Sequence, residues 1–330
     1  MNKRVDFELF GTSAHPELME ELAQRLEIEH GRYRLESLLN FNSLPRLQTK
    51  VADRRVFIIH SFAPKPEIEG EFADFKKLIR AAREYGASEI IPIVTYFSYV
   101  RSHRRIPEGV PIAAKLYAEE IKNAGADKVV LIVLHNLDIE RYFNVPVIHL
   151  GTKPLLINAL KKFIGDKNTV LISPDLGRKA RIGTFADAMH LSLACGEKKR
   201  ESPTTVKIVD IHGEIKKRII VVDDEINNGG TIESLCLYLL TNFPQVREII
   251  LAFTHGVLCG PAVARLSHIS SIAKEQGVKI KIFITNTLPI PATKRIPNMK
   301  ILSVAPMLKD VVDSINAGEE IKQKYLYREN

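Results

Sequence analysis

The sequence predicts an α/β protein with two tandem domains, in which helices flank mostly parallel sheets. Apolar runs of strand length alternate with amphipathic stretches of helix length along nearly the whole chain, which is typical of parallel βαβ units. With 330 residues, the chain is about twice as long as an average domain. The runs KVVLIVLH at 128–135 and EIILAFTH at 248–255 each lead into a histidine, and this likeness indicates a duplicated domain.

The expected elements form two series that meet near residue 151, and local signals explain their boundaries. Gly86 and Gly125 follow two expected helices, and glycine readily adopts the left-handed conformation that ends a helix. The strands expected from apolar runs lie at 56–61, 89–95, 128–135, 145–150, 169–173, 206–211, 219–222, 248–254 and 279–285. The helices expected from helical periodicity lie at 71–85, 111–123, 154–164, 178–190, 261–276 and 307–317, with one more beginning at Thr231.

Composition narrows the class of protein. The chain has 45% hydrophobic and 26% charged residues, which is ordinary for a globular protein. Neither a membrane-spanning run nor the apolar core of a signal peptide is visible. The three cysteines are odd in number and show no metal-ligand spacing. This pattern suits free thiols in a reducing compartment, so we expect a cytoplasmic protein. The net charge of +8 suits phosphorylated metabolites, whereas scattered basic residues without an aromatic platform argue against nucleic acid.

The segment 219–232, IIVVDDEINNGGTI, is the most informative part of the chain. A buried strand is followed by Asp223 and Asp224, then by a glycine turn and a helix that begins at Thr231. Glycines let the backbone N–H groups converge, and the helix dipole adds positive potential, so this order predicts a phosphate cradle. The two acids are better suited to sugar hydroxyls or Mg²⁺ than to phosphate. The alternative is an αβ unit with an ordinary polar turn.

This segment resembles the phosphoribosyl-pyrophosphate loop of phosphoribosyltransferases and of ribose-phosphate pyrophosphokinases. That loop usually reads DD, two residues, then DT(G/A)GT, whereas Asn227 and Asn228 stand here for the second acid and the threonine. Asparagine can still donate to a phosphate and carries no repelling charge. The resemblance implies that ribose 5-phosphate binds to Asp223, Asp224, Asn227, Asn228, Gly229, Gly230 and Thr231.

Further motifs over residues 55–320 are similar to those of the ribose-phosphate pyrophosphokinase family and occur in the same order. They are YFSYVRSHRR at 96–105, LHNLDIERYFNVPV at 134–147, SPDLG at 173–177, EKKR at 197–200 and FTHGVLCGPA at 253–262. The chain is therefore identified as a divergent member of this family. The resemblance implies two phosphoribosyltransferase-like, Rossmann-like domains. The N-terminal domain, 1–150 joined by 307–330, would take the nucleotide, and the domain 151–306 would take the sugar phosphate.

The implied reaction transfers a diphosphoryl group from ATP, or another nucleoside triphosphate, to the anomeric hydroxyl of ribose 5-phosphate. This chemistry needs cations more than a nucleophile. Lys198 and Arg200 match the family's catalytic cations, although a solvated charge run is the alternative. His135 and Asp175 match its Mg²⁺–ATP contacts. The nucleotide-binding residues implied by the family's motifs are Phe41, Arg101, Ser102, His103, Arg104 and His135.

The nucleotide half departs most from the family pattern. The family carries FxDGE where this chain has FNSLPRL at 41–47, so Ser43, Leu44 and Pro45 replace Asp, Gly and Glu. The missing carboxylates predict loose selectivity for the base. Two alternatives remain open, a non-catalytic regulatory homologue and a phosphoribosyltransferase. The resemblance also implies a homo-oligomer, a dimer or hexamer, and no partner among nucleic acids or membranes is expected.

Overall fold

The computed structural model describes residues 6–327 with gaps at 38, 40–42, 102–108, 135, 175–176, 178 and 201–205. For residues 100–101, 198–200 and 206–207 it describes the backbone alone. The chain forms two compact units. Unit 1 comprises the described parts of Met1–Gly151, Thr287–Pro289 and Ser303–Tyr327. Unit 2 comprises those of Thr152–Asn286 and Ile290–Leu302.

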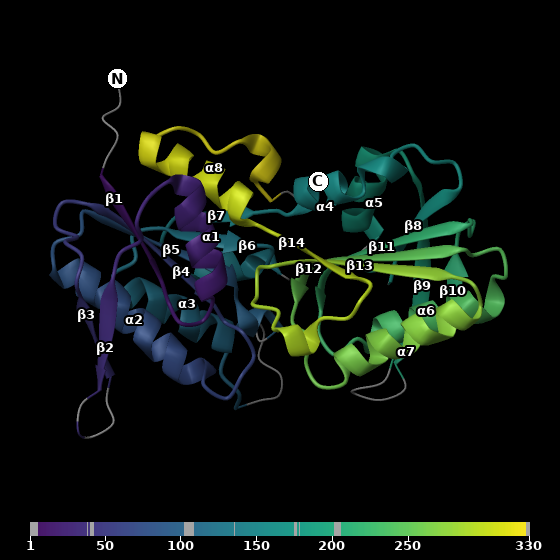
Figure 1. Ribbon diagram of the computed structural model, residues 1–330, viewed down its shortest axis with the longest axis horizontal. Helices are drawn as coiled ribbons and strands as arrows, with labels where there is room; N and C mark the ends of the chain where they lie inside the picture. Colours follow the sequence, from purple (N-terminus) through teal and green to yellow (C-terminus); the bar gives the residue numbers. More distant parts are fainter. Residues whose placement is uncertain are drawn as a thin grey trace. The chain divides into compact units, whose positions relative to one another are not determined.

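Unit 1 is built on a parallel sheet with the strand order β1-β4-β5-β6-β7 (Figure 1). Its strands are β1 (Phe7–Gly11), β4 (Arg55–Ser61), β5 (Glu89–Tyr96), β6 (Val129–Ile132) and β7 (Val147–Leu150). Its helices are α1 (Pro16–Leu26), α2 (Ile68–Glu84), α3 (Ala113–Ala124) and α8 (Ala305–Ala317), with the short 3-10 helices η1 (Ser98–Arg101), η2 (Leu137–Tyr142) and η6 (Gln323–Tyr325). A separate antiparallel hairpin pairs β2 (Tyr33–Ser37) with β3 (Ser43–Leu47).

Long-range contacts join the late segments of the chain to unit 1. α8 packs against α1, and Ser303 donates a hydrogen bond to Glu21 of α1 at 2.7 Å. The buried hydroxyls of Ser61 and Thr95 both donate to the carbonyl of Thr287, at 3.0 and 2.7 Å. These contacts place short segments from far along the chain in the N-terminal unit.

Unit 2 is built on a seven-stranded sheet with the order β10-β9-β8-β11-β12-β13-β14. Only the pairing of β10 with β9 is antiparallel among these described pairs. The strands are β8 (Thr169–Ser173), β9 (Ser192–Arg200), β10 (Val206–His212), β11 (Arg218–Ile226), β12 (Glu248–Gly256), β13 (Lys279–Thr285) and β14 (Met299–Leu302). The helices are α4 (Lys153–Ala159), α5 (Lys179–Met189), α6 (Gly230–Asn242) and α7 (Ala262–Glu275), with the 3-10 helices η3 (Lys161–Phe163) and η5 (Ala292–Lys294).

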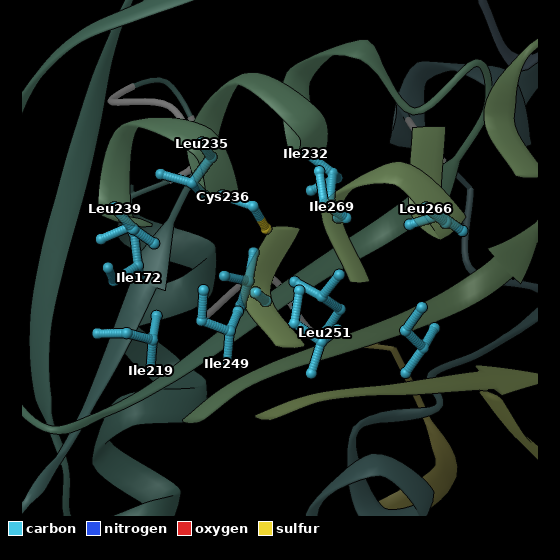
Figure 2. Close-up of a cluster of buried hydrophobic side chains, with 14 of the residues drawn as sticks. Ile172, Ile219, Ile232, Leu235, Cys236, Leu239, Ile249, Leu251, Leu266 and Ile269 are labelled. Carbon is cyan, nitrogen blue, oxygen red and sulfur yellow. The ribbon is translucent and has the colours of Figure 1, made fainter. Parts of the chain in front are cut away.

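Helices cover both faces of the unit 2 sheet because its central strands are apolar on both sides. On one face, Ile219 and Val221 of β11 pack in a cluster with Leu235 and Leu239 of α6 and with residues of α7 (Figure 2). On the other face, the intervening residues of β11 pack with residues of α4 and α5. Successive side chains of a strand point to opposite faces, so one strand supplies both layers.

The predicted fold class is confirmed, because both sheets are mostly parallel and are flanked by helices. β8 and β13 have the predicted bounds, and Gly86 and Gly125 have the positive φ values of 84° and 122° expected after a helix. The strand predicted at 128–135 is shorter, since β6 ends at Ile132. Sequence periodicity did not predict β1, α1, β2, β3 or β14. Within the described residues, no helix combines the length and apolar character needed to cross a membrane.

Candidate active site

The predicted phosphate loop lies between β11 and α6, at the carboxyl end of a central strand of unit 2. β11 is longer than the four-residue strand expected, because its pairing with β12 continues through Asp223 and Glu225 to Ile226. The two acids therefore lie inside the strand, just before its end. The carboxyl ends of parallel strands are where open α/β sheets bind their ligands.

Asp223 and Asp224 have different surroundings, since adjacent side chains of a strand point to opposite faces. Asp224 is only 4% exposed and forms an ion pair with Arg181 of α5. Asp223 is half-buried, and its Oδ1 accepts the N–H of Asp224 at 2.8 Å. Arg181 thus balances one of the two predicted sugar ligands. No motif in the sequence indicated this arginine.

The turn itself has the geometry of an anion-binding helix start. Gly229 precedes α6 with φ 75° and ψ −1°, a left-handed conformation that suits glycine. The side chain of Asn228 accepts the N–H of Gly230 at 3.0 Å. The N–H groups of Gly229 and Thr231 make no hydrogen bond to another described residue. Free N–H groups at the positive end of a helix dipole favour an anion such as phosphate.

Residues that follow β12 hold the loop through hydrogen bonds to its backbone carbonyls. The N–H groups of Leu258 and Cys259 donate to the carbonyls of Ile226 and Asn227, both at 3.0 Å. Arg265 of α7 donates to the carbonyl of Asn228 at 3.0 Å as well. Three consecutive carbonyls of the loop therefore accept hydrogen bonds from residues 258–265. This contact gives the FTHGVLCGPA motif a structural role that its sequence did not indicate.

The other predicted site residues are described only in part. Lys198 and Arg200 lie in β9, where their backbones pair with Ile208 and Val206 of β10, and their side chains lie outside the described part. Arg101 ends η1, and its side chain is likewise outside it. The remaining predicted residues that lie outside the described residues are Phe41, Ser102, His103, Arg104, His135 and Asp175.

The residues at the positions of the family's acids lie in the β2–β3 hairpin. Ser43 begins β3, and its hydroxyl donates to Asp74 of α2 at 2.5 Å and accepts from Lys77 at 3.0 Å. Leu44 is half exposed, and Pro45 pairs with Leu35 of β2. These three residues supply no carboxylate, and the hydroxyl of Ser43 is already engaged with α2.

One cluster among the described residues has side chains that could hold a metal ion. Glu197 of β9 and Asp210 and His212 of β10 bring their ligand atoms within 4.8 Å of one another. All three side chains are exposed, and His212 Nε2 lies 2.9 Å from Glu197 Oε2. Exposed groups of this kind are common without a metal. The cluster is not the predicted pair His135 and Asp175, which the described residues do not include.

Comparison with known proteins relates the chain to one family of enzymes. Residues 7–125 match the family model of the N-terminal domain of ribose phosphate pyrophosphokinase. The ribose-phosphate pyrophosphokinase of Caldanaerobacter subterraneus is 32% identical, over 96% of this chain and 97% of the relative. That of Clostridium acetobutylicum is 31% identical over 96% of each chain. The crystal structure of phosphoribosylpyrophosphate synthetase from Mycobacterium smegmatis matches with a TM-score of 0.82 at 29% identity, covering 94% of this chain and 98% of that one.

Two mostly parallel sheets with flanking helices, and a glycine turn at a helix start beside paired acids, define an α/β protein with an anion-binding type of loop. The agreement with the relatives extends over nearly the whole of each chain. The chain belongs to the ribose-phosphate pyrophosphokinase family.

Proposed function

We propose that the protein is a ribose-phosphate diphosphokinase. It transfers the diphosphoryl group of ATP, or of another nucleoside triphosphate, to the anomeric hydroxyl of ribose 5-phosphate and releases AMP. The observation that carries this proposal is the match to enzymes of this name over 96% of the chain. A match across both units does not favour a regulatory homologue or a phosphoribosyltransferase.

Ribose 5-phosphate binds, in this proposal, at the β11–α6 loop of the second unit. The phosphate accepts hydrogen bonds from N–H groups within Asn228–Thr231, of which that of Gly230 already donates to the side chain of Asn228. The acids accept from the ring hydroxyls. The free N–H groups of Gly229 and Thr231 and the left-handed turn at Gly229 support this assignment. The charge of Asp224 is balanced by its ion pair with Arg181.

Lys198 and Arg200 act in the transition state. The anomeric hydroxyl attacks the β-phosphorus, and negative charge grows on the phosphoryl oxygens and on the departing AMP. Cations placed beside those oxygens lower the barrier without any covalent intermediate. Both residues lie at alternate positions of β9.

The nucleotide binds through the N-terminal unit with Mg²⁺. Phe41 stacks on the base, and residues 101–104 and His135 contact the phosphates. The family resemblance assigns the metal to His135 and Asp175, which would hold it, and the bound ion would neutralise charge on the triphosphate. Asp175 would supply an oxygen ligand of the kind that Mg²⁺ prefers.

The protein works in the cytoplasm as a homo-oligomer, a dimer or hexamer. All three cysteines are free thiols, which suits a reducing compartment. Light scattering on the purified protein measures the assembly directly, and a monomer at all concentrations would contradict this part of the proposal.

The activity is tested with purified protein, ribose 5-phosphate, Mg²⁺ and each nucleoside triphosphate in turn. We expect AMP and phosphoribosyl pyrophosphate in equal amounts, and neither product when the sugar phosphate is left out. Binding of the sugar phosphate without either product would instead indicate a regulatory homologue.

A further inference from the structure

Arg265 of α7 contacts the phosphate loop through a backbone carbonyl. Its Nη1 donates to the carbonyl of Asn228 at 3.0 Å, and its Nε lies 3.0 Å from a carboxylate oxygen of Glu233. The side chain is only 28% exposed. One guanidinium therefore connects the loop to the first turn of α6. A planar, forked donor suits such a double contact, because its nitrogens reach two acceptors at once.

Gly230 shows how closely the guanidinium lies against the loop. A Cβ added at Gly230 would be 2.9 Å from Arg265 Nη1 and 3.4 Å from the side-chain oxygen of Asn228. The first distance is shorter than normal contacts of a Cβ, and the second lies at the lower limit of the ordinary range. The glycine at this position thus leaves the room that Arg265 occupies.

The ion pair between Arg265 and Glu233 also affects the charge near the phosphate loop. This acid lies in the first turn of α6, where its negative charge would repel a phosphate bound at the same helix end. One of its oxygens pairs with Arg265, and the other lies 3.1 Å from Nδ1 of His268. The arginine therefore compensates a charge that would otherwise oppose the ligand.

We propose that Arg265 is a positioning residue for the phosphate loop. It holds the carbonyl of Asn228 so that the N–H groups that follow face the phosphate, and it balances Glu233. The nature of the ligand rests on the proposed function, whereas the effect of Arg265 on the loop does not.

Two substitutions at Arg265 and one control test this role. Arg265→Ala removes the contacts with the carbonyl of Asn228 and with Glu233. Arg265→Lys keeps the positive charge, but its single side-chain nitrogen replaces the two nitrogens that make these contacts. The control is Arg247→Ala, since Arg247 also donates to backbone carbonyls, those of Pro244 and Val246 at 2.5 and 2.9 Å. Arg247 lies before β12, at the opposite end of the sheet from the loop.

The first measurement is amide hydrogen exchange of residues 226–233. We expect at least fivefold faster exchange in Arg265→Ala, an intermediate rate in Arg265→Lys and an unchanged rate in Arg247→Ala. Equal rates in all variants would overturn the inference, whatever the protein's activity.

The second measurement is steady-state kinetics with ribose 5-phosphate. A positioning residue stabilises the bound substrate and the transition state equally. KM should therefore rise about ten- to a hundredfold in Arg265→Ala, with little change in kcat. A fall in kcat alone would contradict a role in the phosphate loop. A wild-type protein without activity would refute the proposed function, and the exchange rates would still decide the role of Arg265.

Discussion

Replacing Gly229 by alanine separates the stability of the loop from its function. Gly229 has φ 75°, and a Cβ there would be no closer than 3.5 Å to Ala262, which is an ordinary contact. The cost is therefore conformational, about 1–2 kcal/mol for a residue with a Cβ in the left-handed region. For a folding unit of roughly 150 residues, this corresponds to a fall in Tm of about 2–8 °C.

Gly277 provides a matched control in the same unit. It has φ 71°, no atom lies within 4 Å of its added Cβ, and it follows α7 rather than the phosphate loop. Gly277→Ala should lower Tm by a similar amount. Only Gly229→Ala should also weaken the binding of ribose 5-phosphate, because a relaxed turn moves the N–H groups of the loop.

Calorimetric titration with ribose 5-phosphate, together with thermal unfolding, measures both effects. The loss of one hydrogen bond to a charged phosphate, about 1.5–3 kcal/mol, predicts a dissociation constant roughly ten- to a hundredfold higher for Gly229→Ala. Gly229→Asn should recover part of both losses, since asparagine tolerates this conformation. Equal affinities of Gly229→Ala and Gly277→Ala would refute the assignment of the loop to the phosphate.

Four further outcomes are expected. Lys198→Ala should lower kcat by about a hundredfold or more, roughly 3 kcal/mol, with a small change in KM, and steady-state kinetics that show a pure KM effect would contradict a transition-state role. Asp224→Ala should weaken sugar-phosphate binding but not nucleotide binding in calorimetry, and it should lower the free energy of unfolding by about 3 kcal/mol because the largely buried ion pair between Asp224 and Arg181 is lost; unchanged sugar affinity would remove Asp224 from the site. The values of kcat/KM for ATP and GTP should lie within about a hundredfold of each other, because Ser43 and its neighbours offer no carboxylate to the base. A stronger preference for ATP would show that other groups recognise adenine. Burial lowers the pKa of His60 from 6.5 to about 3, so the unfolded chain binds a proton that the folded one does not between these values. The contribution of His60 to the free energy of unfolding should therefore be fully present above pH 6.5 and fall by up to about 1.4 kcal/mol per pH unit below it. Denaturant titrations at several pH values should show that the free energy of unfolding of His60→Gln depends less steeply on pH. The same pH dependence in both proteins would contradict this account.

Local order in the sequence was enough to predict the class of fold and the loop of the candidate site. β8 has a continuous apolar centre, and β13 alternates lysine with isoleucine before an apolar end, so the bounds of both follow from the local sequence pattern. The strand end, the glycine turn and the start of α6 are contiguous in the chain, so the phosphate loop could be predicted without knowledge of the packing. The family motifs predicted the activity for the same reason, because each motif is a short continuous segment.

The tertiary structure alone decided which groups support that loop. Asp224 meets Arg181 across 43 residues, and Asn228 meets Arg265 across 37. Neither contact follows from periodicity, because it depends on which helix faces which side of β11 after packing. The length of β11 was also a tertiary result, since its pairing with β12 carries the strand through the polar residues 223–225, whereas its apolar run ends at Val222. Burial and pairing with remote segments, rather than local propensity, place the two acids on opposite faces of the sheet.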